Sequence, residues 1–173
     1  VDQGVHDAKA LQEGTPQTFP ISLAMEEGPL TGRITDVYPK GRVVLQASKA
    51  KGKYTIALWI THLALRAAVT QERWSSYLIP DGDIVTLGMS MSSDEARQHL
   101  QDLLSMYHRG QRVPISFFPK TSWAYFESQY VKSKDIDVAM AAARKTWLGG
   151  FTKPEKDAYH EMVFGQEDPL DDG

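Results

Sequence analysis

Cysteine is absent from the 173 residues of this chain. Its absence excludes a disulfide framework, a thiolate metal site and a cysteine nucleophile. Long apolar runs are missing too, because the nearest candidate, residues 58–69, is shorter than the ~20 residues that span a bilayer and carries His62 and Arg66. We therefore expect no membrane partner. A reducing cytoplasm is compatible with this composition, and we expect a cytoplasmic location.

A strong positive charge is lacking as well. The chain has 19 basic and 22 acidic residues, which gives a net charge of −3. Such a balance does not draw the whole domain toward nucleic acid, so any DNA contact has to come from a local basic patch. There is also no glycine-rich phosphate loop, no nucleophile elbow and no histidine pair with metal-ligand spacing. These absences exclude the commonest nucleotide, hydrolase and zinc sites.

With 42% apolar residues, the chain is long enough to bury a sizeable core. We predict a single domain over residues 1–173, with a lead-in at 1–16, a core and C-terminal helices at 17–165, and an acidic tail at 166–173. The chain starts at Val1 rather than at Met and has no basic or apolar leader. We expect it to be a piece of a longer polypeptide.

The hydrophobic pattern predicts an α/β (α+β) fold with a mixed sheet flanked by helices. Three meandering strands come first, and Pro20 marks the first of them as an edge or bulged strand. Ser92 and Glu95 form a capping box before a later helix. The expected strands lie at 17–25, 30–38, 42–48, 74–79 and 84–89, with an extended stretch at 113–118, and the helices at 54–68, 92–109, 121–130, 135–147 and from a second capping box at 152–155 to about 164.

The second and third strands resemble the catalytic hairpin of a restriction-endonuclease-like, PD-(D/E)xK-type scaffold. Such a hairpin supplies an Asp from one strand and an acid, a spacer and a Lys from the next, because a divalent cation needs oxygen ligands. Asp36 stands at the first position. Gln46 replaces the second acid, with Ser48 at the lysine position, and Lys49 is one residue too late. The sequence therefore predicts a catalytically degenerate, metal-free site.

Two alternatives stay open. The first is an active Mg-dependent nuclease whose second acid is displaced to Glu26, Glu27 or Asp83. The second is a free-standing scaffold unrelated to DNA. Asp36 itself also has a structural explanation, since an acid before a Pro-Lys-Gly turn can accept hydrogen bonds from loop amides.

Lys49, Lys51 and Lys53 form the densest basic cluster. They are candidates for contact with the DNA backbone, because alternate lysines on an exposed segment can each neutralise one phosphate. The simpler alternative is a solvated turn. Likewise, the aromatic segment at 117–123 has two interpretations, core packing or docking of a partner.

Separated blocks from about residue 17 onward resemble the C-terminal region of RecC, the gamma subunit of exodeoxyribonuclease V (RecBCD). They occur in the same order along most of the chain. The blocks are Thr31–Ile34, Trp59–Leu65, Phe117–Tyr125, Ala142–Trp147 and Phe164–Leu170.

This resemblance implies a nuclease-like domain without nuclease chemistry, inactive alone but part of an ATP-dependent helicase and exonuclease. It implies RecB-like and RecD-like partner subunits in a heterotrimer, with duplex DNA ends and single-stranded DNA held inside the complex. The implied role is repair of DNA double-strand breaks by recombination. No cofactor is expected in this domain, since ATP and Mg are used by the partner subunits.

Overall fold

The computed structural model describes residues 8–69, 75–88, 90–149, 157–165 and 168–170. Trp74, Met89 and the second capping box predicted at 152–155 lie outside these ranges. The chain divides into two compact units, Val1–His108 and Arg109–Gly173. Compactness alone does not test whether the two units unfold together, so the single domain over 1–173 stays a prediction.

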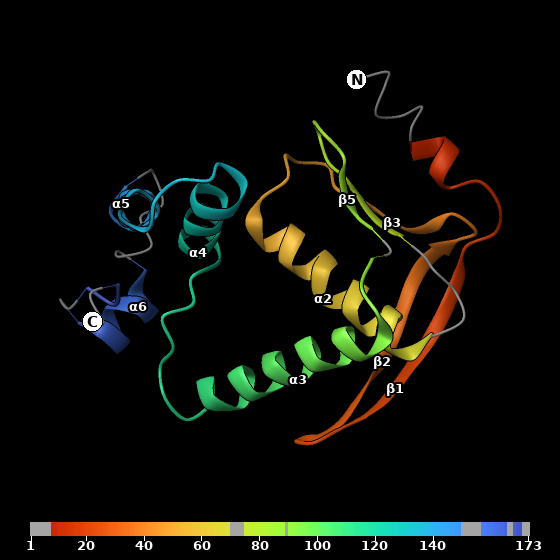
Figure 1. Cartoon of the computed structure of the whole chain (residues 1–173), viewed down its shortest axis with the longest axis horizontal. Coiled ribbons are helices and arrows are strands. Elements are labelled where there is room, and N and C mark those ends of the chain that lie inside the picture. The colour runs from red at the N-terminus through yellow and green to blue at the C-terminus, as the bar shows by residue number, and fades with distance from the viewer. Residues whose placement is uncertain (1–7, 70–74, 89, 150–156, 166–167, 171–173) are drawn as a thin grey trace. The chain divides into compact units, whose positions relative to one another are not determined.

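The N-terminal unit is built on a five-stranded mixed sheet in the order β1-β2-β3-β4-β5 (Figure 1). β3 and β4 run parallel, and the other neighbours are antiparallel. A parallel pair needs a long crossover, which α2 (Gly52–Ala68) supplies. The strands are β1 (Gln17–Met25), β2 (Gly28–Tyr38), β3 (Gly41–Leu45), β4 (Ser75–Ile79) and β5 (Val85–Leu87).

The predicted strands are confirmed in order and pairing, with shifted ends. β1 is an edge strand, as Pro20 indicated. β3 ends at Leu45 instead of Ser48, because the chain there turns toward α2. At the start of β3, Gly41 has a φ of 136°, and a Cβ would collide with the carbonyl oxygen of Ser75. Only glycine allows β4 to pair this closely at the turn.

The main core lies between one face of the sheet and two helices. α2 contributes Leu63 and Leu65, which are almost completely buried, and α3 (Ser93–Gly110) contributes Leu100. The sheet contributes alternate residues of β1 and β2, as a half-buried strand requires. This core contains Ile21, Leu23, Ile34, Val37, Leu63, Ala64, Leu65, Ala67, Ala96 and Leu100.

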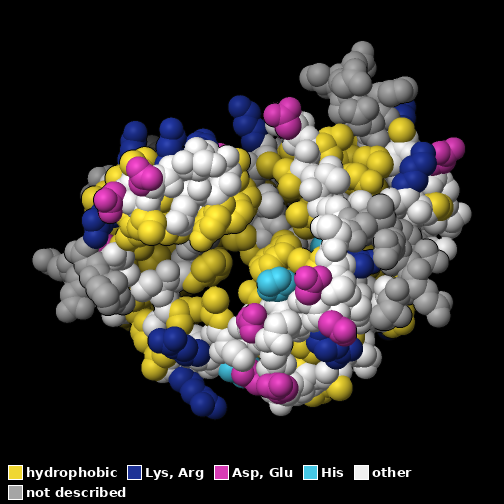
Figure 2. All heavy atoms as spheres, in the orientation of Figure 1, with side chains coloured by type: hydrophobic (Ala, Val, Ile, Leu, Met, Phe, Trp, Pro, Cys, Tyr) yellow, Lys and Arg dark blue, Asp and Glu magenta, His cyan; other side chains and the backbone are white. Residues whose placement is uncertain are grey.

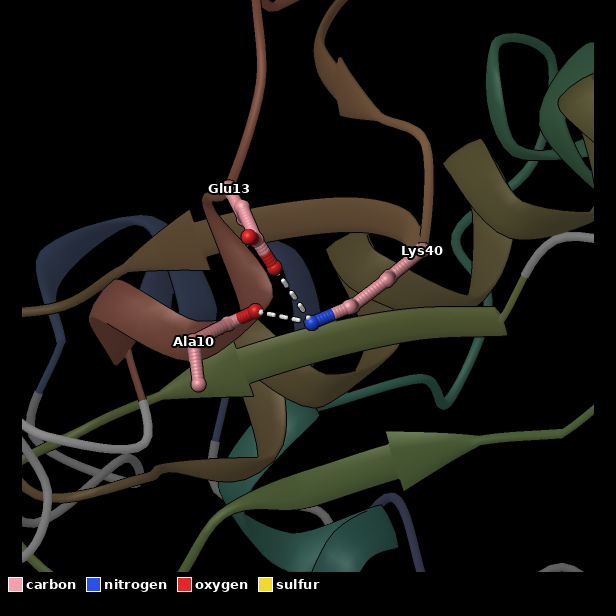
Figure 3. A network of polar contacts seen from close by, with 3 residues as sticks. All are labelled: Ala10, Glu13 and Lys40. Atoms are coloured by element: carbon pink, nitrogen blue, oxygen red, sulfur yellow. Dashed lines mark hydrogen bonds and ion pairs between the residues drawn. The ribbon is translucent and has the colours of Figure 1, made fainter.

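The opposite face of the sheet carries a smaller core. Val43 and Ile79 pack there against Ala8, which belongs to a short helical segment at 8–11. Lys40, in the β2–β3 turn, donates hydrogen bonds to the carbonyl oxygen of Ala10 at 2.8 Å and to Glu13 at 2.9 Å (Figure 3). The lead-in is therefore attached to the hairpin, and the sheet is flanked by helical elements on both faces.

The C-terminal unit is helical. It contains α4 (Pro119–Phe126), the π-helical segment η1 (Glu127–Val131), α5 (Ile136–Leu148) and α6 (Ala158–Phe164). α4 begins two residues before the predicted Thr121, because Pro119 takes the first helical position, where no backbone donor is needed. Its core includes Phe118, Thr121 and a stripe of α5 residues four apart, Ala139, Ala143 and Trp147.

Part of the predicted acidic tail packs on this unit. Pro169 is buried, and Asp168 lies 3.8 Å from Arg144, measured from Oδ2 to Nε. Residues 168–170 of the predicted acidic tail are thus held against this unit. Within the described ranges, no helix is both long and apolar enough to cross a membrane.

Candidate functional site

Asp36 lies near the end of β2, as predicted, in an unusual backbone conformation. Its φ is 60°, in the left-handed region that side-chain-bearing residues rarely adopt. Gln17 pairs with Val37 and Phe19 with Ile34, so two residues of β2 face one residue of β1. This is a β-bulge, a feature that re-aims side chains and is common beside active sites. The Thr35 hydroxyl donates a hydrogen bond of 2.7 Å to the Asp36 carboxylate.

A positive charge accompanies Asp36. Arg42, at the start of β3, donates hydrogen bonds to the Thr35 carbonyl oxygen at 3.3 Å and to the Thr61 hydroxyl on α2 at 2.7 Å. Burial lowers the pKa of the Arg42 guanidinium, and the negative charge of Asp36 acts against this effect. Arg42 therefore compensates the charge of Asp36 from within the hairpin.

The hairpin register does not bring Asp36 and Gln46 to the same level. Val37 pairs with Arg42 and Tyr38 with Gly41, and four residues separate Arg42 from Gln46, which is about 13 Å along a strand.

Gln46 lies just beyond the end of β3, and Lys49 lies in the loop that follows it. The backbone of Gln46 extends the β3–β4 ladder through a 2.9 Å hydrogen bond to Ile79, and its side-chain amide donates to the Ser48 hydroxyl at 3.1 Å. Lys49 is exposed in the loop before α2. Thus the three positions that the sequence predicted as a degenerate site lie on a strand bulge, just beyond a strand end and in a loop.

The alternative acids lie away from Asp36. Glu27 is in the β1–β2 turn, nine residues before Asp36 along β2, or roughly 30 Å of extended strand. Its carboxylate accepts a 2.5 Å hydrogen bond from Ser105 and lies 3.6 Å from His108. Asp83 lies in the β4–β5 turn, beyond the far end of β3. Among the described residues, no three or more His, Asp or Glu side chains are grouped as a metal site would need.

The lysine cluster gathers at the N-terminus of α2. We call residues 48–54 the lysine loop. Lys51 is the N-cap of α2, and the first turn has no acidic residue. The positive end of the helix dipole therefore adds to the charge of the lysines. All three lysines are exposed.

Tyr54 also belongs to the lysine loop, although the sequence did not point to it. The ammonium group of Lys53 lies 4.8 Å from the centre of the Tyr54 ring. A hydrogen bond with Ser48, followed by the charges of Lys53 and Lys51, lowers the pKa of the Tyr54 hydroxyl. These contacts bring two lysines and a tyrosine together at one helix end.

His62 is buried, as expected for a histidine of an apolar helix. Its Nδ1 lies 2.9 Å from the Ser76 hydroxyl of β4. Burial lowers the pKa of the imidazole, and the charge of Arg66 acts in the same direction, whereas a hydrogen bond with the Gly88 backbone opposes them. His62 is therefore a neutral core residue that joins α2 to the sheet.

Some side chains of the aromatic segment at 117–123 are packed in the core, whereas others are exposed and available to a partner. Phe118 is 5% exposed and packs against Trp147, with ring centres 4.4 Å apart. Phe117, by contrast, is 43% exposed. Trp123 is half-buried and lies 5.4 Å from Phe126, which in turn lies 5.4 Å from Tyr130, ring centre to ring centre. Core packing explains Phe118, whereas Phe117 is left on the surface.

The comparisons with known proteins identify the family. The five-stranded mixed sheet and its crossover helix define a mixed α/β domain, and the family model of the RecC C-terminal domain matches residues 3–130. The chain belongs to this family. The match contains the whole sheet, α2, α3 and α4, and it ends within η1.

Two curated relatives agree with this result. The chain is 27% identical over 128 residues to the RecBCD enzyme subunit RecC of Mycolicibacterium smegmatis, covering 72% of the chain and 12% of that relative. It is 23% identical over 139 residues to the RecBCD enzyme subunit RecC of Escherichia coli K12, covering 78% of the chain and 12% of the relative. The chain therefore spans about an eighth of the length of these relatives.

Proposed function

We propose that this chain is a non-catalytic, nuclease-like domain of a RecC-type subunit. In this role it helps to assemble RecB-like and RecD-like subunits and to position DNA strands during repair of double-strand breaks by recombination. The observation that carries the proposal is the charge arrangement at the hairpin. Arg42 places a positive charge near Asp36, and Gln46 supplies no charge at the position of the second acid.

Electrostatics supports the loss of catalysis. A hydrated divalent cation is captured by several oxygen ligands with net negative charge. At the hairpin, the positive charge of Arg42 opposes the negative charge of Asp36, and Gln46 contributes only a neutral amide that already donates to Ser48. Such a site attracts Mg²⁺ weakly and cannot activate a water molecule for attack on a phosphodiester.

We also propose that the lysine loop contacts phosphates of DNA without reading sequence. Lys49, Lys51 and Lys53 are exposed beside a helix N-terminus, where the dipole favours an anion. Phosphate contacts of this kind orient a protein on DNA and carry no base information. Because only three lysines are involved, the domain alone binds weakly.

Incubation of the purified chain with linear duplex and single-stranded DNA tests the catalytic part of this proposal. With Mg²⁺ or Mn²⁺ present, we expect no cleavage above a protein-free control. Cleavage that is abolished by Asp36→Ala would show an active nuclease with a displaced second acid. The Asp36→Ala variant, purified in the same way, also serves as a control for contaminating nucleases.

The assembly part is tested by co-purification of the full-length subunit with its RecB-like and RecD-like partners. We expect a stable complex that depends on the presence of this domain. A truncated subunit, from which the region corresponding to this chain is deleted, is the comparison. If it assembles equally well and its complex binds DNA ends with unchanged affinity, the proposed function is wrong. A scaffold unrelated to DNA would then be the better explanation.

The DNA part is tested by replacing Lys49, Lys51 and Lys53 with Ala in the assembled complex. Affinity for DNA ends should fall equally for different end sequences, and the slope of log K against log salt should decrease by at most roughly one unit per lysine. Lys9→Ala is a matched control, since Lys9 is also exposed but lies outside the lysine loop. If the affinity for DNA ends and the salt slope are both unchanged, the lysine loop does not contact DNA and is a solvated turn.

A further inference from the structure

A groove with an aromatic floor lies on the C-terminal unit and includes Phe117 and Phe118 of the aromatic segment. Its volume is about 360 Å³. One wall is the extended segment 110–118, and the other is α6, through His160, Val163 and Phe164. We call it the aromatic groove. Figure 2 shows apolar side chains gathered on the surface of this unit.

The floor of the aromatic groove is rigidly packed. Phe118 is buried, and its ring centre lies 4.9 Å from that of His160 and 5.6 Å from that of Phe164. His160 also packs on Trp147, with ring centres 5.3 Å apart. Because these rings hold one another in place, a ligand does not have to order them on binding, which reduces the entropic cost.

The rim of the groove is apolar and open to solvent. Val113 is 45% exposed, Phe117 43% and Val163 46%. α6 itself has no buried residue. Exposed apolar side chains around a concave site indicate an interaction surface when they are contiguous. Here they line the same groove from two different segments of the chain.

The charged side chains that line the groove indicate whether a nucleic acid or an acidic peptide would bind there. Among the described residues that line the groove, Arg112 is the only one with a permanent charge, and none carries a carboxylate. A nucleic-acid strand requires a track of cations along its phosphates, which a single guanidinium does not offer. One guanidinium matches one carboxylate, with which it can form two parallel hydrogen bonds.

We propose that the aromatic groove docks a short apolar segment of a partner protein, with a large apolar side chain on the floor and an Asp or Glu beside Arg112. This deepens the assembly role proposed above and rests on it, since it assigns a face and a partner chemistry to that role. The segment inserts between Phe117 and Val163, and its carboxylate pairs with the guanidinium at the rim.

Site-specific photo-crosslinking in the assembled complex tests this inference. A benzophenone side chain replaces Val163 in the full-length subunit, and the cross-linked peptide is identified by mass spectrometry. We expect one partner segment that contains Asp or Glu within a few residues of a large apolar residue. Met162 is the matched control, because it is 76% exposed on the same helix but does not line the groove.

Three outcomes would overturn the inference: no partner cross-link from position 163 in an intact complex, a cross-link to nucleic acid, or a cross-link to a second copy of this chain. Failure of the complex to form at all would instead count against the proposed function. The two results are thus distinguishable.

Two variants then test the contacts. Phe117→Ser and Arg112→Glu should each weaken assembly about tenfold or more, a size typical of residues at the centre of an interface. Tyr159→Ser should leave it unchanged, because Tyr159 is 75% exposed and outside the groove. Far-UV circular dichroism confirms folding of each variant. Replacing the carboxylate of the identified segment with Lys should restore binding to Arg112→Glu, and absence of this rescue would contradict the pairing.

Discussion

At the scale of single residues, the β-bulge in β2 determines where the carboxylate of Asp36 lies. Its left-handed conformation and the hydrogen bond from Thr35 hold the carboxylate near Arg42. A bulge of this type re-aims one side chain without disturbing the rest of the ladder. Arg42 adds a positive charge to the surroundings of this carboxylate.

Substitution of Asp36 should reveal the cost of this conformation. Asp36→Val should lower the free energy of unfolding by about 1–2 kcal/mol, because a β-branched side chain is strained in the left-handed region. Asp36→Asn should cost much less, since asparagine tolerates that region. Urea denaturation measures both. Thr31→Val controls for the introduction of valine, because Thr31 is exposed on the same strand. Equal losses of stability for Asp36→Val and Asp36→Asn would argue against the bulge in solution.

His62 should make stability depend on pH. Burial holds the pKa of His62 in the folded chain below its ordinary value of 6.5, so the unfolded chain binds the proton first. The contribution is therefore complete above pH 6.5 and decreases as the pH falls from 6.5 toward the folded-state pKa. The loss is at most about 1.4 kcal/mol per pH unit for one proton.

Urea denaturation at pH 7.5, 6.5 and 5.5 measures this effect. His62→Gln should flatten the dependence, because glutamine keeps a polar partner for Ser76 and does not titrate. The exposed His99 gives a control through His99→Gln, which should leave most of the pH dependence in place. A dependence that is the same in the wild type and in His62→Gln would assign it to other groups.

At the scale of elements, α3 begins with the reciprocal cap that its sequence predicted. The Glu95 amide donates to the Ser92 hydroxyl at 3.1 Å, and the Ser92 amide donates to the Glu95 carboxylate at 2.8 Å. Hydrogen bonding from Ser92 lowers the pKa of the Glu95 carboxyl. α3 in turn covers the main core with Ala96 and Leu100. The cap therefore stabilises an element on which the core depends.

Ser92→Ala should lower the free energy of unfolding by about 1 kcal/mol, within the range of 0.5–2 kcal/mol for a lost N-cap. Chemical denaturation monitored by circular dichroism measures the change. Ser90→Ala is the control, since Ser90 is exposed and precedes the cap. If both variants are equally stable, the capping box contributes nothing in solution.

At the scale of the whole molecule, the two units differ in how much core they contain. Both hydrophobic clusters lie within residues 8–103. Among its described residues, the C-terminal unit buries few apolar side chains and exposes many, including Tyr130, Val131 and Ile136. A small unit with an exposed apolar surface gains stability when a partner covers it. This agrees with a domain that acts inside a larger assembly.

A fragment of residues 1–110 should therefore fold by itself, whereas a fragment of residues 109–173 should be marginally stable. Circular dichroism and urea unfolding measure both. We expect a cooperative transition for the first fragment and a broad, low-stability transition for the second. An unfolded 1–110 fragment would mean that the units depend on each other and would support a single domain over 1–173.

Most of the fold was predictable from local signals. Alternating apolar residues, Pro20, the turn at 39–41 and the Ser92–Glu95 capping box act over a few residues, so they determined where strands and helices lie. Their ends were less predictable: β3 stops at Leu45 because the chain turns toward α2, and η1 is π-helical. Both depend on contacts that are distant in sequence.

The sequence by itself excluded cysteine chemistry and predicted a degenerate hairpin, because the absence of cysteine and the presence of Gln46 and Ser48 at the acid and lysine positions require no coordinates. Only the tertiary structure decided what stands beside Asp36. Strand register, which is set by the turn and by the buried faces, brings Arg42 to Asp36 and leaves Gln46 further along β3. Packing between the 110–118 segment and α6 likewise created the aromatic groove, since its two walls come from parts of the chain more than forty residues apart.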